Sequence, residues 1–478
     1  MNGEHKEILK HSGNYLLATI ANKALSFITV PVYTYLLTVE DYGVLNVFSS
    51  TAQVVAVLLT LNTEVAISRY YYDAENENDF KCFVGTSIRF SFIIFSVLSV
   101  LLFLFRNTLA DYMGIESLLV VCLIPFAINI VLDGIFQQIY QPLLESRKIA
   151  IVSCISSYLA VALSVVCMLM LQDKRYYGLI LGTMITFMFM GVYKVIQVNR
   201  YSLKGFDIKH LKYILRFCLP YLPYSLSSII VAQFGKMIIG QQDGFNSAGL
   251  YSFAQNISAL MLVVIVLVHS AWNPYYFKYM NNKDYERIDG DYDIIWRVTL
   301  VIGAFLSLFC YEMGIILARP QYLSCLYQVP ILVLGYLFYQ WSYVYLRNTA
   351  FAKKTIWNAV VVVSAGVFNV VLNAVLIKYF QSLGVAISFA FSYLFMLLIS
   401  WIINRVILKV YATSMMSFIK PFIFYLPIIC VSICFKDTMI LSFETIGVKL
   451  IIFSVFTLFV TKRFYIKWLR GYFGASKM

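Results

Sequence analysis

Apolar runs long enough to cross a membrane follow one another along nearly the whole of this chain. Of its 478 residues, 61% are hydrophobic and only 13% are charged. In soluble domains about a quarter of all residues are charged, so a soluble globular fold is excluded. Each run has roughly the 20 residues that a helix needs to span the hydrocarbon core of a bilayer. We therefore predict an all-α, polytopic membrane protein with about 14 transmembrane helices.

Positive charge is distributed unevenly among the connections between these runs. Most of the 37 Lys and Arg residues lie in every second connection, in the N-terminal segment and in the C-terminal tail. Because Lys and Arg concentrate in cytoplasmic loops, this asymmetry predicts that both termini are cytoplasmic. Membrane orientation thereby accounts for the formal net charge of +13, and we expect no nucleic-acid partner.

The predicted spans occupy defined segments, with limits uncertain by a few residues. They are 14–37, 43–65, 83–104, 117–139, 149–171, 178–198, 213–239, 248–270, 294–316, 326–347, 356–378, 384–404, 418–435 and 445–461. The connections between them are too short to fold alone, so we expect no separate soluble domain.

An internal repeat relates the two halves of the chain. A shift of 206 residues superposes several glycines, paired cations and aromatics that lie outside the apolar runs. The matched positions are Lys10 and Arg216, Gly43 and Gly249, Tyr70-Tyr71 and Tyr276-Phe277, Arg147-Lys148 and Lys353-Lys354, and Gly178 and Gly384. Six is an even number of spans, so both copies enter the membrane in the same direction, as parallel repeats.

The repeat predicts the domain organisation. We expect an N-terminal six-helix lobe at 1–205, a second six-helix lobe at 206–411, and two additional helices with a basic tail at 412–478. Two parallel bundles around a central cleft suit the movement of a solute by alternating access.

Two lysines lie within the predicted spans of the repeated opening hairpin. A lipid-facing ammonium is costly, so such a group should face protein or a water-filled cavity. Lys23 is deep in the first span, whereas Lys236 lies near the outer end of the seventh. We predict that both line the central cleft, although Lys236 is close enough to the interface to snorkel instead.

Other polar side chains in the spans are further candidates. Asn22 shares the polar stripe of Lys23, and Gln53 shares that of Glu64. Glu64 and His269 occupy nearly equivalent points of the two copies and either face the cleft or cap helix ends. Asp133, in the fourth span, is either a structural partner or a proton site. We predict these as cavity-polar or ion-coupling residues.

Signatures of catalysis and of metal or cofactor binding are missing from the sequence. The four histidines form no H-E-x-x-H, and no P-loop with the required spacing follows a strand. We therefore expect no enzymatic activity, no metal site and no cofactor. Transport would be driven by an ion gradient, the membrane potential or removal of the product.

The segment 36–46, Leu-Leu-Thr-Val-Glu-Asp-Tyr-Gly-Val-Leu-Asn, is followed by Ser-Arg-Tyr-Tyr-Tyr at 68–72. With these motifs, the whole chain resembles the polysaccharide-transporter branch of the multidrug/oligosaccharidyl-lipid/polysaccharide exporter superfamily. Two six-span copies plus two extra spans is the architecture of that branch. The resemblance also implies a cation in the first span that faces the cleft, a position that Lys23 matches.

The resemblance implies a flippase in the bacterial cytoplasmic (inner) membrane. Its substrate would be an undecaprenyl-diphosphate-linked oligosaccharide, moved from the cytoplasmic to the periplasmic leaflet during synthesis of O-antigen, capsule or exopolysaccharide. Lys23 and Lys236 would hold the diphosphate, and Glu64, Asp133 or His269 would couple transport to H⁺ or Na⁺. The expected partners are this substrate, membrane lipids and polysaccharide polymerase machinery.

Three other functions remain open at the level of sequence. A cation-coupled multidrug exporter would have a cleft that favours acidic over basic residues. A membrane-embedded polysaccharide polymerase or glycosyltransferase would carry a large catalytic loop outside the membrane. A structural scaffold would leave Lys23 without a reason to be buried.

Overall fold

The helices begin and end where local sequence signals place them. The computed structural model describes residues 3–434 and 443–475, with side chains for residue 18 and for residues 21–433 and 444–462. Thr38 caps the second helix because its Oγ1 accepts a hydrogen bond from Asp41 N at 3.1 Å. Asn76 caps the fourth in the same way, through Asp79 N at 2.9 Å. The described residues contain helices and connections and no strand, which confirms the all-α class.

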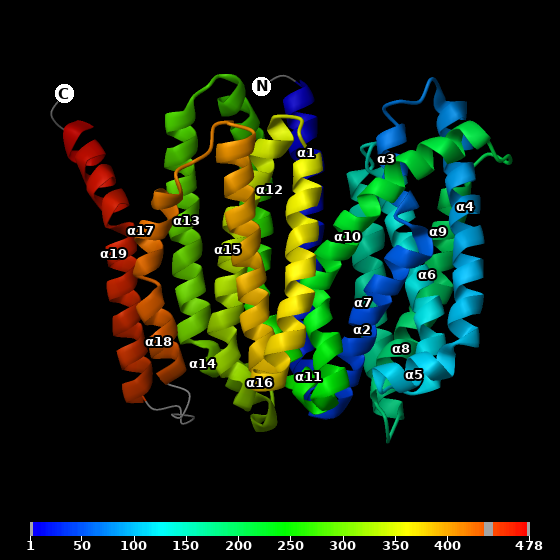
Figure 1. The fold of residues 1–478 in the computed structure, drawn as a ribbon, viewed down its shortest axis with the longest axis horizontal. Helices are drawn as coiled ribbons and strands as arrows, with labels where there is room; N and C mark the ends of the chain where they lie inside the picture. Colours follow the sequence, from blue (N-terminus) through cyan, green and yellow to red (C-terminus); the bar gives the residue numbers. More distant parts are fainter. Residues whose placement is uncertain (1–2, 435–442, 476–478) are drawn as a thin grey trace. The chain divides into compact units, whose positions relative to one another are not determined.

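The chain divides into two compact units at Gly249. Unit 1, residues 1–249, contains α1 to α10 (Figure 1). Its helices are α1 (Gly3–Leu36), α2 (Val39–Thr60), α3 (Thr63–Tyr70), α4 (Glu77–Leu104), α5 (Arg106–Met113), α6 (Ser117–Tyr140), α7 (Ser146–Met170), α8 (Tyr176–Thr186), a π-helical turn (Phe187–Gly191), α9 (Val192–Asn199) and α10 (Ile208–Gln242). The helix α11 (Gly244–Ser258) crosses the division.

Unit 2, residues 250–478, contains the remaining helices. They are α12 (Leu260–Asn281), α13 (Tyr285–Leu308), α14 (Cys310–Leu317), a 3₁₀ helix (Pro320–Gln328), α15 (Val329–Phe351), α16 (Ile356–Ile402), a π-helical turn (Ile403–Ile407), α17 (Met415–Ile423), α18 (Leu426–Cys434) and α19 (Phe443–Ala475). Within this unit α15 packs along α16, and α13 contacts α12, α15, α17 and α19.

Membrane-spanning potential is confirmed along the described chain. Eleven helical stretches are long and apolar enough to cross a bilayer, and a twelfth is formed by α13 and α14 if that pair, bent by 61°, is one span. The stretch from Ile356 to Ile407 holds two predicted spans, divided at Gln381, whose φ is 50°. The predicted first span falls on α1, which is helical throughout. The predicted count of about 14 is consistent with this arrangement.

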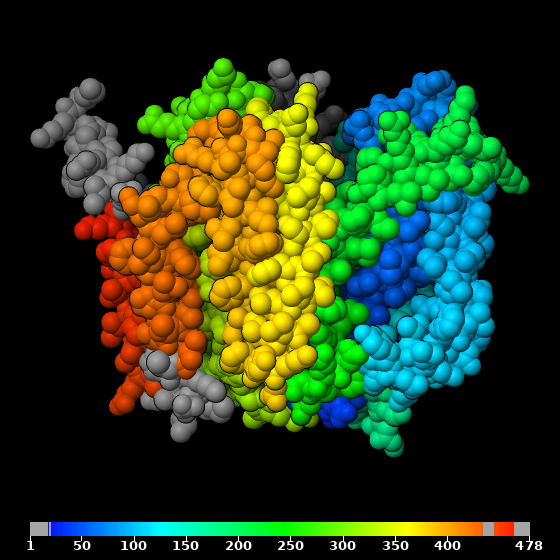
Figure 2. Space-filling view, viewed as in Figure 1, coloured from blue at the N-terminus to red at the C-terminus, as the bar shows by residue number. Residues whose placement is uncertain are grey.

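In unit 1, α10 packs on helices that precede it by more than 100 residues. It contacts α2, α3 and α4, while α1 packs along α7 and α2 lies against α6 (Figure 1). Figure 2 shows the first part of α10 lying next to α2 and α4 on the surface of this unit. The first helix of the second sequence copy is therefore part of the first compact unit. The proposed boundary between copies at 205/206 follows sequence similarity, whereas the boundary at Gly249 follows packing.

Two glycines matched by the repeat, Gly43 and Gly249, touch each other. A Cβ on Gly43 would lie 1.8 Å from the carbonyl oxygen of Phe245 and 2.9 Å from Gly249 N. A Cβ on Gly249 would lie 2.1 Å from the carbonyl oxygen of Val39. Only residues without a side chain permit this approach of α2 to α11.

Candidate functional site

The first helix presents Asn22 and Lys23 in different directions. Asn22 Nδ2 donates to Ser153 Oγ of α7 at 2.8 Å, within the contact between α1 and α7. Lys23 follows in sequence and is exposed on the surface of the protein. An ammonium inside a span needs contact with water or an anion rather than with lipid. That Lys23 makes this contact in a cavity stays a prediction. The hydrogen bond of Asn22 joins α1 to α7 next to Lys23.

A polar seam joins α2 to α10 and brings two of the predicted residues together. Ser50 Oγ donates to Gln233 Oε1 at 2.9 Å, and Gln233 Nε2 donates to Gln53 Oε1 at 3.4 Å. Lys236 follows Gln233 by one helical turn and is only 8% exposed. It forms no ion pair with a carboxylate among the described residues. A buried ammonium without a counter-ion is costly, so this seam suits an anion.

The second predicted span is broken, whereas a continuous helix over 43–65 was predicted. Leu61 and Asn62 both adopt the left-handed conformation, with φ of 50° and 56°. This conformation ends α2 at Thr60 and restarts the chain as α3 at Thr63. Tertiary hydrogen bonds support the break, because Asn62 Nδ2 donates to Ser225 of α10 and Thr63 bonds Ser91 of α4.

Glu64 lies in the first turn of α3, directly after this break. Its Oε2 is shielded from solvent and has no hydrogen-bond partner among the described residues. A Cβ on Gly134 of α6 would lie 3.3 Å from Glu64 Cγ, so the glutamate packs directly on α6. An incompletely satisfied buried carboxylate favours binding of a proton or a cation.

Asp133 precedes Gly134 on α6 and has a partner. It forms an ion pair with Lys194 of α9, and Lys194 is only 2% exposed. The partly exposed Asp133 supplies the buried ammonium of Lys194 with its counter-ion, which favours the structural interpretation of Asp133. Lys194 was not singled out from the sequence, because it lies near the end of a span, where cations usually anchor helices.

In unit 2, His269 of α12 is bound to a buried arginine that the sequence did not single out. Arg347 Nη2 lies 2.9 Å from His269 Nδ1, and both side chains are almost fully buried. A guanidinium can only donate, so Nδ1 accepts and the imidazole proton is on Nε2. The Arg347 guanidinium carbon also lies within 5.1–5.4 Å of the ring centres of Trp272, Tyr276 and Tyr343.

This aromatic cage leaves hydrogen-bonding capacity unused. Arg347 Nη1 and His269 Nε2 are both buried and have no partner in the described part of the chain, and no carboxylate there pairs with Arg347. Cation–π contacts offset part of the desolvation of the guanidinium, but its positive charge is not neutralised. The pair is therefore suited to an anion, and His269 in this arrangement serves as an acceptor for Arg347.

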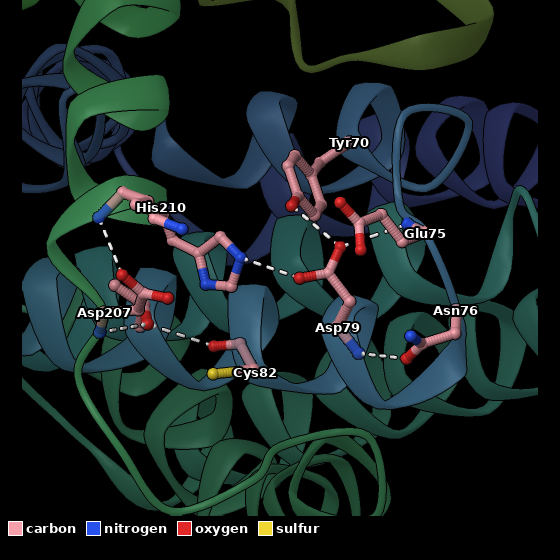
Figure 3. Close-up of polar contacts among 9 residues, drawn as sticks. Tyr70, Glu75, Asn76, Asp79, Cys82, Asp207 and His210 are labelled. Atoms are coloured by element: carbon pink, nitrogen blue, oxygen red, sulfur yellow. Dashed lines mark hydrogen bonds and ion pairs between the residues drawn. The ribbon is translucent and has the colours of Figure 1, made fainter.

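A third polar cluster joins α3, α4 and the start of α10 (Figure 3). Tyr70 Oη donates to Asp79 Oδ2 at 2.9 Å, and His210 Nε2 lies 3.0 Å from Asp79 Oδ1. Burial and the hydrogen bond to Asp79 raise the pKa of the Tyr70 phenol above its ordinary value. Asp207 caps α10 through Lys209 N at 2.7 Å, and its own N–H donates to Thr86 Oγ1 at 3.2 Å. These contacts hold the connection between α9 and α10, where the two sequence copies meet, against α4.

The predicted site residues thus fall into separate groups. Lys23, Lys236 and Glu64 belong to unit 1 and His269 belongs to unit 2. A common cleft lined by all of them stays a proposal. The described residues hold no cluster of three or more His, Cys, Asp or Glu side chains with metal-binding geometry.

The fold of this chain is similar to the folds of solved transporter structures. The structure is similar to the lipid II flippase MurJ in an inward closed conformation, with a TM-score of 0.71 and 15% identity over 97% of this chain and 100% of that one. It is also similar to an inward-facing multidrug resistance MATE family transporter of the MOP superfamily, with a TM-score of 0.64 and 15% identity over 82% and 98%. At this identity the likeness shows a shared fold and no more.

Sequence comparison points to the polysaccharide branch. The chain is 22% identical over 292 residues to the Lsg locus putative protein 1 of Haemophilus influenzae, which covers 58% of this chain and 68% of that protein. The family described as polysaccharide biosynthesis protein matches residues 8–280. Since this match spans more than half of the chain, the protein is a multi-pass membrane protein that belongs to the polysaccharide biosynthesis protein family.

Proposed function

We propose that this protein is a flippase for an undecaprenyl-diphosphate-linked oligosaccharide in the bacterial cytoplasmic membrane. It would carry the repeat unit of an O-antigen, capsule or exopolysaccharide from the cytoplasmic to the periplasmic leaflet by alternating access, with both of its termini in the cytoplasm. The released product would then be used by polysaccharide polymerase machinery. Family membership and the exporter fold support this proposal.

The observation that carries the proposal is that each unit holds a buried cation that forms no ion pair with a described carboxylate. Lys236 in unit 1 and Arg347 in unit 2 both lie in candidate spans, and neither pairs with a carboxylate among the residues described. Leaving a charge buried and unpaired costs about 3–5 kcal/mol. A substrate that brings its own negative charge, such as a diphosphate, removes this cost while it is bound. Lys23 would add a third, more accessible cation.

Glu64 is the residue we assign to coupling with H⁺ or Na⁺. Its unpartnered Oε2 distinguishes it from Asp133, which is bound to Lys194, and from His269, which accepts from Arg347. A carboxylate in this setting changes its charge when a cation binds, and that change would bias one conformation of the transporter over another.

Reconstitution in liposomes tests the proposal. The purified protein is expected to move a labelled lipid-linked oligosaccharide between leaflets, and Lys23→Ala, Lys236→Met and Arg347→Met should each slow this movement strongly. Lys353→Ala, a change in an exposed connection, serves as the control. In cells, Lys23→Ala should accumulate lipid-linked repeat units in the inner leaflet, and normal surface polysaccharide in that strain would contradict the assignment.

Glu64→Gln separates coupling from binding. We expect this variant to bind substrate but to lose the response of transport to an imposed ion gradient. A multidrug exporter would instead export cationic drugs and be insensitive to the loss of Lys236 and Arg347. A polymerase or glycosyltransferase would lengthen the oligosaccharide in the same liposomes.

A further inference from the structure

Unit 2 contains a cavity of about 800 Å³ between α13, α17 and α19. These helices lie side by side in Figure 1, and α13 contacts both of the others. The volume is in the range of small-molecule sites, roughly 300–1,000 Å³. Its polar lining includes Asp289, Asp293, Arg297, Ser414, Ser417, Lys420 and Lys462.

One arginine and one carboxylate in this cavity pair with each other. Arg297 Nε donates to Asp293 Oδ2 at 2.9 Å, and its Nη1 donates to the carbonyl oxygen of Val460 at 2.7 Å. Asp289 accepts a hydrogen bond from Tyr411 Oη. Lys420 and Lys462 remain exposed, and neither pairs with a carboxylate in the described residues. The Tyr411 hydroxyl is neutral, so Asp289 keeps its negative charge, and the three cations and two carboxylates that line the cavity leave a net charge of +1.

An apolar groove continues from the cavity along α19. It is lined by Val455, Leu458, Phe459 and Lys462, of which Phe459 and Lys462 also line the cavity. This spacing of three, four and seven residues places the groove on one face of the helix. It extends about 10 Å from Lys462, at 1.5 Å per residue. The Phe459 ring lies 4.3 Å from that of Phe424, centre to centre, at the junction of cavity and groove.

The cavity lies where apolar spans end. In the sequence Lys462 directly follows the last predicted span, 445–461, and Lys420 lies in the first part of the candidate span Met415–Ile433. Cations at such positions reach the lipid headgroup region, whereas Val455 and Leu458 lie deeper along the same helix. The site thus offers positive charge at headgroup depth and an apolar track toward the hydrocarbon core.

We propose that this cavity binds one anionic glycerophospholipid, such as phosphatidylglycerol. The phosphate would bind between Lys420 and Lys462, the headgroup hydroxyls would contact Ser414 and Ser417, and an acyl chain would follow the groove on α19. Such a lipid would connect α17 and α19 to α13, next to the Arg297 contact with Val460. The proposal is independent of the flippase assignment.

Native mass spectrometry of the full-length protein released from nanodiscs tests the site. With equal phosphatidylglycerol and phosphatidylethanolamine, the wild type should retain one phosphatidylglycerol, and the double variant Lys420→Gln/Lys462→Gln should retain at least about 10-fold less. The double variant Lys353→Gln/Lys354→Gln removes the same charge from a connection outside the cavity and should retain wild-type occupancy. Lys420→Arg/Lys462→Arg keeps both positive charges and should retain the lipid. That result would attribute the lipid lost from the Gln variant to the missing charge rather than to misfolding.

Further probes identify the chemical source of the ligand. Leu458→Ser should weaken binding of a dioleoyl lipid and leave binding of a dihexanoyl analogue unchanged. Binding of inorganic phosphate as tightly as of phosphatidylglycerol, or equal retention of phosphatidylethanolamine, would overturn the proposal. Preference for farnesyl diphosphate over phosphatidylglycerol would also overturn it and assign the cavity to an isoprenyl diphosphate.

Discussion

The two compact units differ in the partners of their charged side chains. In unit 1, Asp133 and Lys194 form an ion pair between α6 and α9. The 206-residue shift matches these positions to Tyr339 and Ser400 in unit 2, which carry no charge at neutral pH. Conversely, the buried Arg347 of unit 2 corresponds to Gln141 in unit 1.

This difference separates charges that serve the fold from charges that are available to a ligand. A buried ion pair that is complete is a local structural contact, because each charge satisfies the other. A buried guanidinium that contacts aromatic rings and a neutral imidazole, and pairs with no carboxylate among the described residues, is costly to the apoprotein. For each charged residue, the 206-residue shift gives a position in the other half of the sequence, and a substitution there serves as the control.

The largest expected effect is on transport by Arg347→Met. Losing a charge-assisted contact of about 2–3 kcal/mol should slow lipid-linked oligosaccharide transport by about 100-fold. The melting temperature should stay the same or rise, because an apolar side chain replaces an unneutralised charge. The equivalent variant Gln141→Met should leave transport near the wild-type rate. A stability loss with unchanged transport would show that Arg347 is a structural residue.

Asp133→Asn should have the opposite pattern. It leaves the buried Lys194 without its counter-ion and should lower the free energy of unfolding by about 2 kcal/mol, less than for a fully buried pair because Asp133 is partly exposed. The double variant Asp133→Leu/Lys194→Met should recover most of this loss, and Ser400→Ala in unit 2 should be nearly neutral. Thermal unfolding in detergent measures all three, and an equal loss in the single and double variants would contradict the pairing argument.

Sequence periodicity predicted the helical class, the spans and the repeat, because these depend on apolar length and on residues outside the membrane. Lys23 and Lys236 were singled out from the sequence because a cation inside an apolar run is conspicuous, and their role in a cleft stays a prediction. Arg347 was missed because it lies at the predicted end of its span, where cations usually mark the membrane interface. Its burial depends on Trp272, Tyr276 and Tyr343, which only tertiary packing brings around it.

The break after α2 was missed for a different reason. Leu61 and Asn62 adopt positive φ without the glycine or proline that usually marks such a break. Their conformation is stabilised by side chains of α4 and α10, which are distant in sequence. Pairings across helices, such as Asp133 with Lys194, are likewise invisible in one sequence without homologues.

Helix breaks in the two halves of the chain differ in conformation, so glycine substitutions there should differ in their effect on stability. Leu61 is left-handed, with φ of 50°, whereas Ala259, between α11 and α12, is right-handed with φ of −67°. Leu61→Gly removes a steric penalty of about 1–2 kcal/mol, which offsets the lost side-chain contacts, so its stability should stay near the wild-type value. Ala259→Gly should destabilise by about 1 kcal/mol. Equal destabilisation of both variants, measured by thermal unfolding, would contradict the assigned left-handed conformation.

The smallest expected effect concerns acid stability at Glu116, the residue before α6 in unit 1. Lys174 and Tyr177 bind its carboxylate, with Tyr177 Oη 2.8 Å from Oε2, and the hydrogen bond from Lys174 holds its pKa below the ordinary value. A carboxyl whose folded pKa is depressed stabilises the fold above its unfolded pKa, and this contribution is lost as pH falls through the folded pKa. The group is partly exposed, so the contribution should be below about 1 kcal/mol. Between pH 6 and pH 3 the melting temperature should fall less steeply with pH for Glu116→Gln than for the wild type. The control is Tyr322→Phe, at the position that the 206-residue shift matches to Glu116, and it should leave the slope of melting temperature against pH unchanged. Identical slopes for Glu116→Gln and the wild type would show that the cluster with Lys174 adds nothing to stability.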